Sequence, residues 1–203
     1  MKPFFEIHIP KTGGISRHSI LKKYCKDFQR PKTDKIKVGD SLWFGHNDPE
    51  ETLRFITMEH YKQAIKVCWI RDPRARLVSL YHFYLFKEWV DSNIIFSDFV
   101  DMVIKKPLYP IGLYARKELS PCNPQVRWIE NVTIDFMGRF ENMEFDWKSF
   151  CSLIEIPFEP LPHLNKRGQK INWRNYYNDP VLLQDVNRFY IEDLKLGVYK
   201  EQI

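Results

Sequence analysis

The stretch IHIPKTGGIS, residues 7–16, decides the fold, because a lysine and two glycines directly follow an apolar run. We expect a strand from Phe4 to Ile9 and its following helix from Ser16 to Phe28. A glycine-containing turn between a parallel strand and a helix leaves backbone N–H groups aimed at one point, where the helix dipole adds positive potential. The turn therefore predicts an anion-binding site, although an ordinary strand-to-helix connection could have the same residues.

Outward from this turn, segments of strand character alternate with segments of helical character, which is typical of an α/β fold with a mostly parallel sheet. The apolar run AIKVCWI, residues 64–70, is expected to be the most buried strand. Pro73 is expected to begin the next helix. We expect further strands within residues 41–46 and 132–141, helices beginning at Asp48 and near Trp147 to Ile154, one closing helix from about Asp179, and loops at residues 29–40 and 157–174.

Composition limits the classes of protein to consider. The 203 residues are 44% hydrophobic and predict a single domain over residues 1–203. A net charge of +5 is small for a dedicated DNA-binding protein and can be explained by a small anionic ligand. The four cysteines form no CxxC pair, so reduced thiols are expected. We see no signal peptide and no membrane-spanning run, and therefore expect a soluble, cytoplasmic protein.

The order of residues in the turn argues against ATP. The nucleotide triphosphate P-loop places its lysine after the glycines, whereas Lys11 precedes Gly13 and Gly14. The buried strand ends at Arg71 and not at an acid that could bind magnesium. We therefore expect Lys11, the two glycines and the Ser16 hydroxyl to bind an anion without a metal.

A second motif follows the buried strand. In IRDPRARLVSLYHFY, residues 70–84, Arg71 lies at the carboxyl end of the strand, where open α/β sheets bind their ligands. Ser79 lies about two turns into the expected helix. Arg71 and Ser79 could bind a second phosphate, or they could be an arginine beside Asp72 and an exposed helical serine.

Together, HIPKTGG and IRDPRARLVSLY resemble the sulfotransferases that use 3′-phosphoadenosine 5′-phosphosulfate (PAPS), particularly the carbohydrate branch that includes heparan sulfate 2-O-sulfotransferases. The resemblance implies a P-loop nucleotide-kinase-like three-layer fold, PAPS as co-substrate, 3′,5′-adenosine bisphosphate as product, and no required metal. It implies that Arg71 and Ser79 hold the 3′-phosphate. It also implies that the 5′-phosphosulfate is held by Lys11, Thr12, Gly13, Gly14, Ile15 and Ser16, with Lys11 stabilising the departing phosphate. A looser similarity in the late basic loop implies roles at the nucleotide for Arg167 and Gly168, whereas Lys170 could contact the nucleotide or belong to a solvated run of charges.

A base must accept the proton of the attacking hydroxyl. His46, at the end of SLWFGH, matches the position of the family's catalytic histidine, with Glu6 and Asp48 as alternatives. His8 is expected to be a packed histidine. His163 could approach the ligands, and Trp173 could be a core residue or an adenine-stacking ring.

We therefore expect an enzyme that moves a sulfuryl group from PAPS to a hydroxyl, on a carbohydrate acceptor, by in-line displacement. The alternatives are an ATP-dependent small-molecule kinase and a noncatalytic polyanion-binding module. Neither nucleic acid nor a membrane is an expected partner.

Overall fold

The computed structural model describes residues 1–25, 41–43, 57–105, 119–162, 164 and 171–200. The chain forms two compact units. The first comprises Met1–Ile70 and Trp128–Gly168, and the second Arg71–Arg127 and Gln169–Ile203. The single domain expected for residues 1–203 stays a prediction. Each unit is described by itself below.

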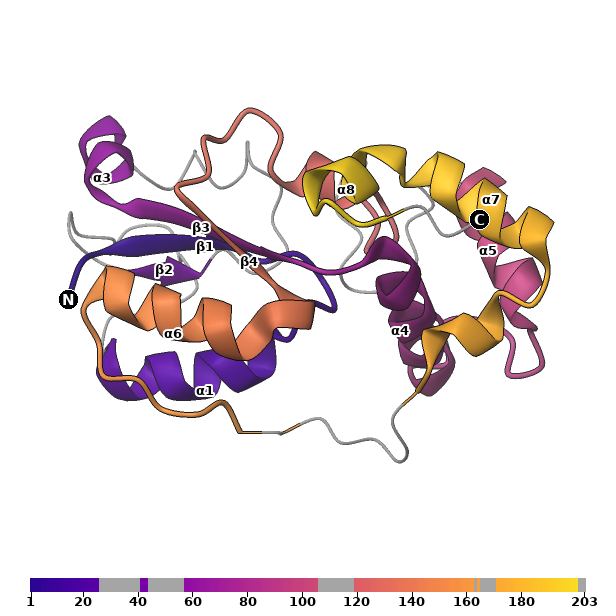
Figure 1. The fold of residues 1–203 in the computed structure, drawn as a ribbon, viewed down its shortest axis with the longest axis horizontal. Coiled ribbons are helices and arrows are strands. Elements are labelled where there is room, and N and C mark those ends of the chain that lie inside the picture. The colour runs from indigo at the N-terminus through magenta and orange to yellow at the C-terminus, as the bar shows by residue number, and fades with distance from the viewer. Residues whose placement is uncertain (26–40, 44–56, 106–118, 163, 165–170, 201–203) are drawn as a thin grey trace. The chain divides into compact units, whose positions relative to one another are not determined.

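A parallel sheet lies at the centre of the first unit (Figure 1). Its strands are β1 (Phe4–Ile7), β2 (Leu42–Trp43), β3 (Ile65–Ile70) and β4 (Phe136–Arg139), in the order β2-β1-β3-β4. Every pairing is parallel. In the register, Ile7 of β1 lies beside Cys68 of β3, so the chain leaves both strands at the same edge of the sheet. The predicted parallel α/β sheet is confirmed.

Helices cover both faces of this sheet. Helices α1 (Gly14–Tyr24) and α6 (Met143–Ile154) pack on one face, and Figure 1 shows them side by side. They enclose a core that contains Phe4, Trp69 and Trp147. Helix α3 (Met58–Gln63) packs on the opposite face, where the His60 ring meets Phe5 at 4.8 Å between ring centroids. The three-layer arrangement is therefore present within this unit.

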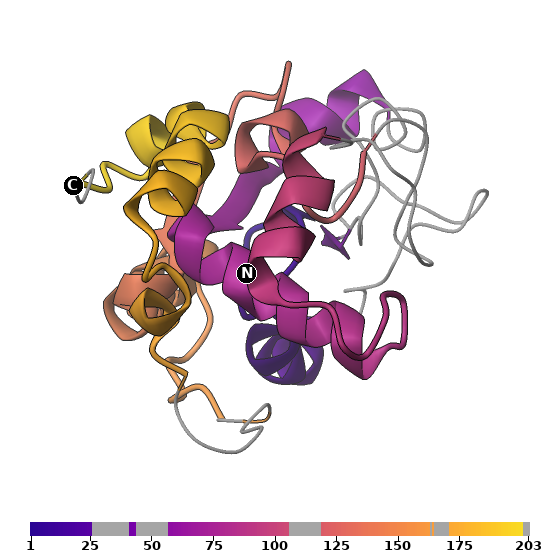
Figure 2. The same cartoon turned by 90° about the vertical axis from the view of Figure 1, so that its right-hand side faces the viewer.

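The second unit is built from helices. Helix α4 (Pro73–Phe86) begins at Pro73 as predicted, and the Asp72 carboxylate accepts the Arg74 N–H at its N-cap. The core combines side chains of α4, α5 (Phe96–Lys105) and α7 (Pro180–Phe189). Figure 2 shows the ribbons of α4 and α5 in magenta and that of α7 in yellow. The short 3-10 helices are η1 (Gln125–Trp128), η3 (Trp173–Tyr176) and, in the first unit, η2 (Phe140–Asn142).

A helix begins at Pro180 with Asp179 as its N-cap, as predicted, but the prediction of one continuous closing helix is wrong. Two helices occupy this segment, α7 and α8 (Ile191–Leu196), with Tyr190 between them in a non-helical conformation at φ −103° and ψ 24°. The Tyr190 ring is buried, and its hydroxyl donates to the Cys122 carbonyl at 2.5 Å. This buried contact holds the residue outside helical geometry. Helices α3 and α5 were not predicted, while the loop at 29–40 and the helix expected at Asp48 lie outside the described residues.

All four cysteines are buried free thiols, as expected. Among the described residues, no helix has both the length and the apolar character needed to cross a membrane.

Replacing Gly138 with alanine should destabilise the first unit. A Cβ at Gly138 would lie 2.3 Å from ring atoms of the buried Trp69, which pairs with it across β3 and β4. Overpacking of this kind costs about 1–3 kcal/mol. Urea unfolding of Gly138→Ala should show that loss. Arg139→Ala, at the exposed neighbouring position, should change the free energy of unfolding by less than about 0.5 kcal/mol. Equal stability of Gly138→Ala and wild type would contradict the packing.

Candidate anion-binding site

The turn after β1 has a backbone that few residues adopt. Lys11 has φ 71° and Gly13 has φ 84°, both in the left-handed region. Glycine enters this region at little cost, but a lysine there stores strain that the surrounding structure must hold. Strained backbone of this kind is concentrated at functional sites. The conformation of Lys11 therefore adds a second reason, beyond its charge, to regard the turn as a binding site.

Thr12 and Gly14 face the interior of the turn. The Thr12 hydroxyl is buried and donates to the Ile9 carbonyl at 2.8 Å, so it closes the turn itself. A Cβ at Gly14 would lie 2.2 Å from the Cε1 atom of His8. Gly14 is thus required by a ring packed beneath the turn, whereas the sequence suggested only close approach of a ligand from outside.

The first turn of α1 has backbone donors and nothing acidic beside them. Among the α-helices that the structure describes, α1 alone has neither a side-chain cap nor an acidic residue in its first turn. Unsatisfied N–H groups at a helix N-terminus attract anions. Ser16 is half-buried and Ile15 is exposed at this end of the helix. The site is therefore suited to a negatively charged ligand.

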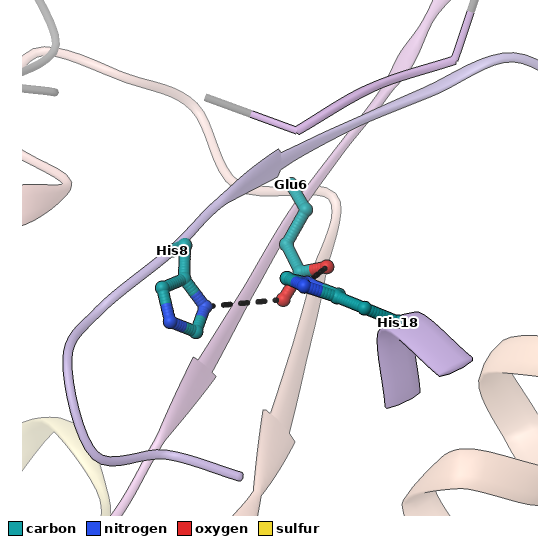
Figure 3. A group of neighbouring side chains, drawn as sticks. All are labelled: Glu6, His8 and His18. Carbon is teal, nitrogen blue, oxygen red and sulfur yellow. Dashed lines mark hydrogen bonds and ion pairs between the residues drawn. The ribbon is translucent and has the colours of Figure 1, made fainter. Parts of the chain in front are cut away.

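A group of charged side chains lies next to the turn, and Figure 3 shows three of them, Glu6, His8 and His18. Arg17, which follows the turn on α1, is fully buried and donates from Nη2 to Glu6 Oε1 at 2.8 Å. The same guanidinium donates from Nη1 to the Thr12 carbonyl at 2.6 Å. His18 Nε2 lies 2.8 Å from Glu6 Oε2, and His8 Nδ1 lies 3.6 Å from Glu6 Oε1. Glu6 is therefore the centre of a network that includes the backbone of the turn.

The electrostatics of this network keep Glu6 ionised. Burial by itself would raise the pKa of Glu6, but the charges of His18 and Arg17, the hydrogen bond of His18 and the neighbouring His8 bring the pKa well below its usual value. Burial lowers the pKa of His8, although Glu6 acts in the opposite direction. A carboxylate with a low pKa that is already bound to two partners is a weak proton acceptor. Glu6 is thus a poorer candidate for the base than the sequence alone suggested, and His8 is packed as expected.

Among the described residues, Glu6, His8 and His18 form a group whose side chains could bind a metal ion. The ligating atoms of Glu6, His8 and His18 all lie within 4.8 Å of one another. However, the Arg17 guanidinium occupies one oxygen of Glu6 and His18 the other. A divalent cation would have to displace these contacts beside a fixed positive charge. The observed contacts favour an ion-pair network over a metal centre.

Arg71 is held by its backbone. The Gln125 amide accepts the Arg71 N–H at 2.9 Å and donates to the Arg71 carbonyl at 2.8 Å. Gln125 is in turn oriented by buried Asp193, which accepts its backbone N–H at 2.8 Å. Ser79 is half-buried on the second turn of α4, the helix that Arg71 precedes. Both residues of the second motif belong to the second unit, whereas the turn belongs to the first.

The other two arginines of the second motif have structural contacts. Arg74 is buried and donates from Nε and Nη2 to the Asp72 carboxylate at 2.9 Å and 2.7 Å. Arg76 is buried and donates to the carbonyls of Pro121 and Asn123. Of the three arginines, Arg71 is the least buried. This leaves Arg71 as the arginine suited to a ligand.

Part of the late loop is described. Trp173 is half-buried against the core of the second unit, with the guanidinium carbons of Arg174 and Arg74 at 4.6 Å and 5.0 Å from its ring centre. Residues 171–174 line a hollow of about 390 Å³. Both earlier interpretations of Trp173 are compatible with this position. The candidates His46, Asp48, His163, Arg167, Gly168 and Lys170 lie outside the described residues.

Two supporting residues were missed from the sequence. Glu6 is an acid within the apolar run FFEI, and a buried acid requires a partner of opposite charge, which was the signal for Arg17. Gln125 carries no comparable signal, because its contact with Arg71 spans 54 positions in the sequence.

The fold and the turn define the class: an α/β protein with a glycine-containing turn, suited to an anion, between its first strand and first helix. Residues 3–200 match the sequence model of the sulfotransferase family, and the chain belongs to that family.

Two solved structures share the fold. The mouse sulfotransferase SULT7A1 complexed with PAP has a TM-score of 0.59 and 14% identity, over 98% of this chain and 88% of that one. A sulfotransferase from Alicyclobacillus acidocaldarius has a TM-score of 0.50 and 13% identity, over 100% of this chain and 98% of that one. No curated protein sequence matches the chain.

The low pKa of Glu6 predicts a loss of stability in acid. A carboxyl whose pKa is lower in the folded than in the unfolded chain stabilises the fold above its unfolded pKa, here 4.5, and loses that contribution as the pH falls through the folded value. Urea unfolding from about pH 7 to about pH 3 should therefore show wild type losing more free energy of unfolding than Glu6→Gln. Parallel pH profiles of the two proteins would contradict this role of Glu6.

Proposed function

We propose that this chain is a PAPS-dependent O-sulfotransferase whose turn at residues 11–16 binds the 5′-phosphosulfate of the donor. The observation that carries the proposal is the turn itself: a left-handed Lys11 and Gly13 directly before a helix with no acid in its first turn and no side-chain cap. Membership of the sulfotransferase family supports a sulfuryl donor as the ligand of this turn. The PAP bound by the mouse structure of the same fold supports the choice of nucleotide.

The second contact with the donor is proposed at Arg71 and Ser79. The chain leaves β1 and β3 at the same edge of the sheet, and the turn follows β1 while Arg71 follows β3 directly. Arg71 has its backbone fixed by Gln125, so its side chain starts from a defined position. A guanidinium and a hydroxyl are suited to a 3′-phosphate. In the late loop, Arg167 and Gly168 are proposed as further contacts with the nucleotide.

The proposed reaction is an in-line displacement at sulfur. The acceptor oxygen forms a bond to sulfur while the bond between sulfur and the 5′-phosphate oxygen breaks, which releases 3′,5′-adenosine bisphosphate. Lys11 and the backbone donors of the turn stabilise the charge that develops on the leaving phosphate. His46 accepts the acceptor's proton. The motif similarity to heparan sulfate 2-O-sulfotransferases supports a carbohydrate acceptor.

Ligand-induced stabilisation tests the donor. We expect 3′,5′-adenosine bisphosphate to raise the Tm of wild type more than AMP, ATP with Mg²⁺ or heparin fragments. Lys11→Ala should weaken the effect of all 5′-phosphorylated nucleotides. Arg71→Ala should abolish the preference for the bisphosphate over AMP. Its Kd for the bisphosphate should rise about 10- to 100-fold, because a charge-assisted contact contributes about 1.5–3 kcal/mol.

Arg188→Ala is the matched control, since Arg188 is an exposed arginine on α7 whose contact is a surface ion pair with Asp185. It should respond like wild type. Stabilisation of wild type by bisphosphate no better than by AMP would exclude PAPS. A larger rise in Tm with ATP and Mg²⁺ would instead indicate a kinase. Equal, salt-sensitive rises in Tm with every polyanion would indicate a noncatalytic binding module.

The base is tested by separating binding from turnover. His46→Ala should lower kcat for sulfate transfer from radiolabelled PAPS to desulfated heparin by about 10²- to 10⁴-fold, while the Kd of 3′,5′-adenosine bisphosphate stays unchanged. Asp48→Asn is the comparison, and it should retain turnover. Loss of bisphosphate binding in His46→Ala would make His46 structural, and a larger kcat loss in Asp48→Asn would make Asp48 the base.

A further inference from the structure

The peptide bond between Thr12 and Gly13 is oriented by a buried side chain. Arg17 Nη1 donates to the Thr12 carbonyl oxygen at 2.6 Å, from below the turn. The described backbone contains no cis peptide bond. In a trans peptide the C=O and the following N–H point in opposite directions. Because the Thr12 carbonyl points inward to Arg17, the Gly13 N–H points away from Arg17, toward the outer side of the turn.

The orientation of the Thr12–Gly13 peptide requires a stabilising contact. Gly13 is in the left-handed region, and a glycine has low barriers to other backbone conformations. Rotation of the Thr12–Gly13 peptide would turn the Gly13 N–H inward and present a carbonyl oxygen to the anion, which repels it. Lys11, also left-handed, belongs to the same strained turn. The turn therefore depends on a contact that makes one orientation of this peptide much more stable than the other.

Arg17 is itself fixed on several sides. Nη2 donates to Glu6 Oε1 at 2.8 Å, and the guanidinium carbon lies 4.3 Å from the centre of the Trp69 ring. Glu6 is held at its other oxygen by His18, at 2.8 Å. All of these side chains are buried. Figure 3 shows Glu6 between His8 and His18. A guanidinium supplies the two separate donors that this arrangement uses, one for the carboxylate and one for the carbonyl.

His8 supports the turn at a second point. Its ring packs so closely under Gly14 that a Cβ there would lie 2.2 Å from Cε1. The ring also lies beside Glu6, with Nδ1 at 3.6 Å from Oε1. The two supports of the turn, Arg17 at Thr12 and His8 at Gly14, thus share one carboxylate.

We propose that Arg17 is a positioning residue for the sulfuryl donor: by binding the Thr12 carbonyl, with Glu6 as its anchor, it turns the Gly13 N–H outward to the 5′-phosphosulfate. This inference rests on the proposed function and deepens it. Arg17 does not touch the donor. Its effect is confined to the 5′-phosphate end of the nucleotide, because the 3′-phosphate is bound by other residues.

The test compares ligands that use different ends of the site. Removing Arg17 alone would leave Glu6 buried without its partner, so the main variant is Glu6→Gln with Arg17→Met, which removes both charges together. We expect the Kd of 3′,5′-adenosine bisphosphate and of AMP, measured by calorimetry, to rise about tenfold or more. The Kd of adenosine 3′-phosphate should stay within about twofold of wild type. In turnover, the KM for PAPS should rise while the KM for the acceptor stays unchanged.

Arg17→Lys provides a second variant that keeps the charge. A lysine has a single ammonium at the end of a flexible chain, and it cannot reproduce the fork that binds carboxylate and carbonyl together. We expect its affinity for the bisphosphate to lie between wild type and the double variant. If the double variant does not fold, Arg17→Lys alone tests the proposal. Affinities of Arg17→Lys for AMP and the bisphosphate equal to those of wild type would overturn it.

Leu21→Ala is the matched control for stability. Leu21 lies on the same helix, is fully buried in the core of the first unit, and is apolar. Its truncation should lower the Tm without changing the Kd of any of the three nucleotides at a temperature where the protein is folded. A rise in the bisphosphate Kd of Leu21→Ala equal to that of the double variant would show a general effect of stability and overturn the proposal.

Three further outcomes are separated by the same measurements. Wild-type protein that does not bind bisphosphate overturns the proposed function, and with it this role of Arg17. Wild-type binding with unchanged affinity in both Arg17 variants overturns the role of Arg17 alone. Zinc chloride that raises the Tm of wild type but not of His18→Ala would identify Glu6, His8 and His18 as a metal site and overturn the network described here.

Discussion

The buried ion pair between Arg17 and Glu6 is the interaction on which the rest of the first unit depends. It joins β1 to α1 directly, and it does so beneath the turn that connects them. Burying two charges is costly unless both are fully bonded. Here Arg17 Nη1 donates to the Thr12 carbonyl, His18 binds the second oxygen of Glu6 and the Trp69 ring lies against the guanidinium, whereas the buried Arg17 Nε has no hydrogen-bond partner. The ion pair between Arg17 and Glu6 therefore acts mainly by fixing the geometry of the turn.

That constraint extends into the sheet. Trp69 can lie against Arg17 because Gly138 on the neighbouring strand leaves room for its ring. Trp69 also contacts Trp147 and Phe150 of α6, at 6.5 Å and 6.1 Å between ring centroids. The turn, the first helix and α6 are thus coupled through one aromatic side chain. A substitution at Gly138 would therefore affect the turn through the contact of Trp69 with Arg17.

The sequence predicted the parts of the fold that local patterns determine. The apolar runs of β1 and β3 and the Asp72–Pro73 start of α4 have short-range signals, and the structure has them where expected. The break at Tyr190 was missed because its cause is a hydrogen bond to Cys122, 68 positions away. In the candidate site, the charged and glycine residues of the turn could be identified from the sequence. The support from Gln125 could not, since its contact with Arg71 spans 54 positions, whereas Arg17 had only the indirect signal of an acid, Glu6, within an apolar strand.

The two proposed anion-binding motifs are built on one principle within their separate units. In each, a buried side chain binds backbone atoms of the motif: Arg17 binds Thr12, and Gln125 binds Arg71. Each of these side chains is oriented by a buried carboxylate, Glu6 or Asp193. The carboxylates differ in electrostatics: the pKa of Glu6 is lowered by its cationic partners, whereas burial raises the pKa of Asp193 because backbone N–H groups and Arg76 offset it only in part. An enzyme that transfers a group from an anionic donor gains most from hydrogen-bond donors that are fixed before the ligand arrives, because reorganisation then costs nothing during the reaction. In both motifs the backbone is held by a fully buried side chain, Arg17 or Gln125, so its position is set by the fold before any ligand arrives.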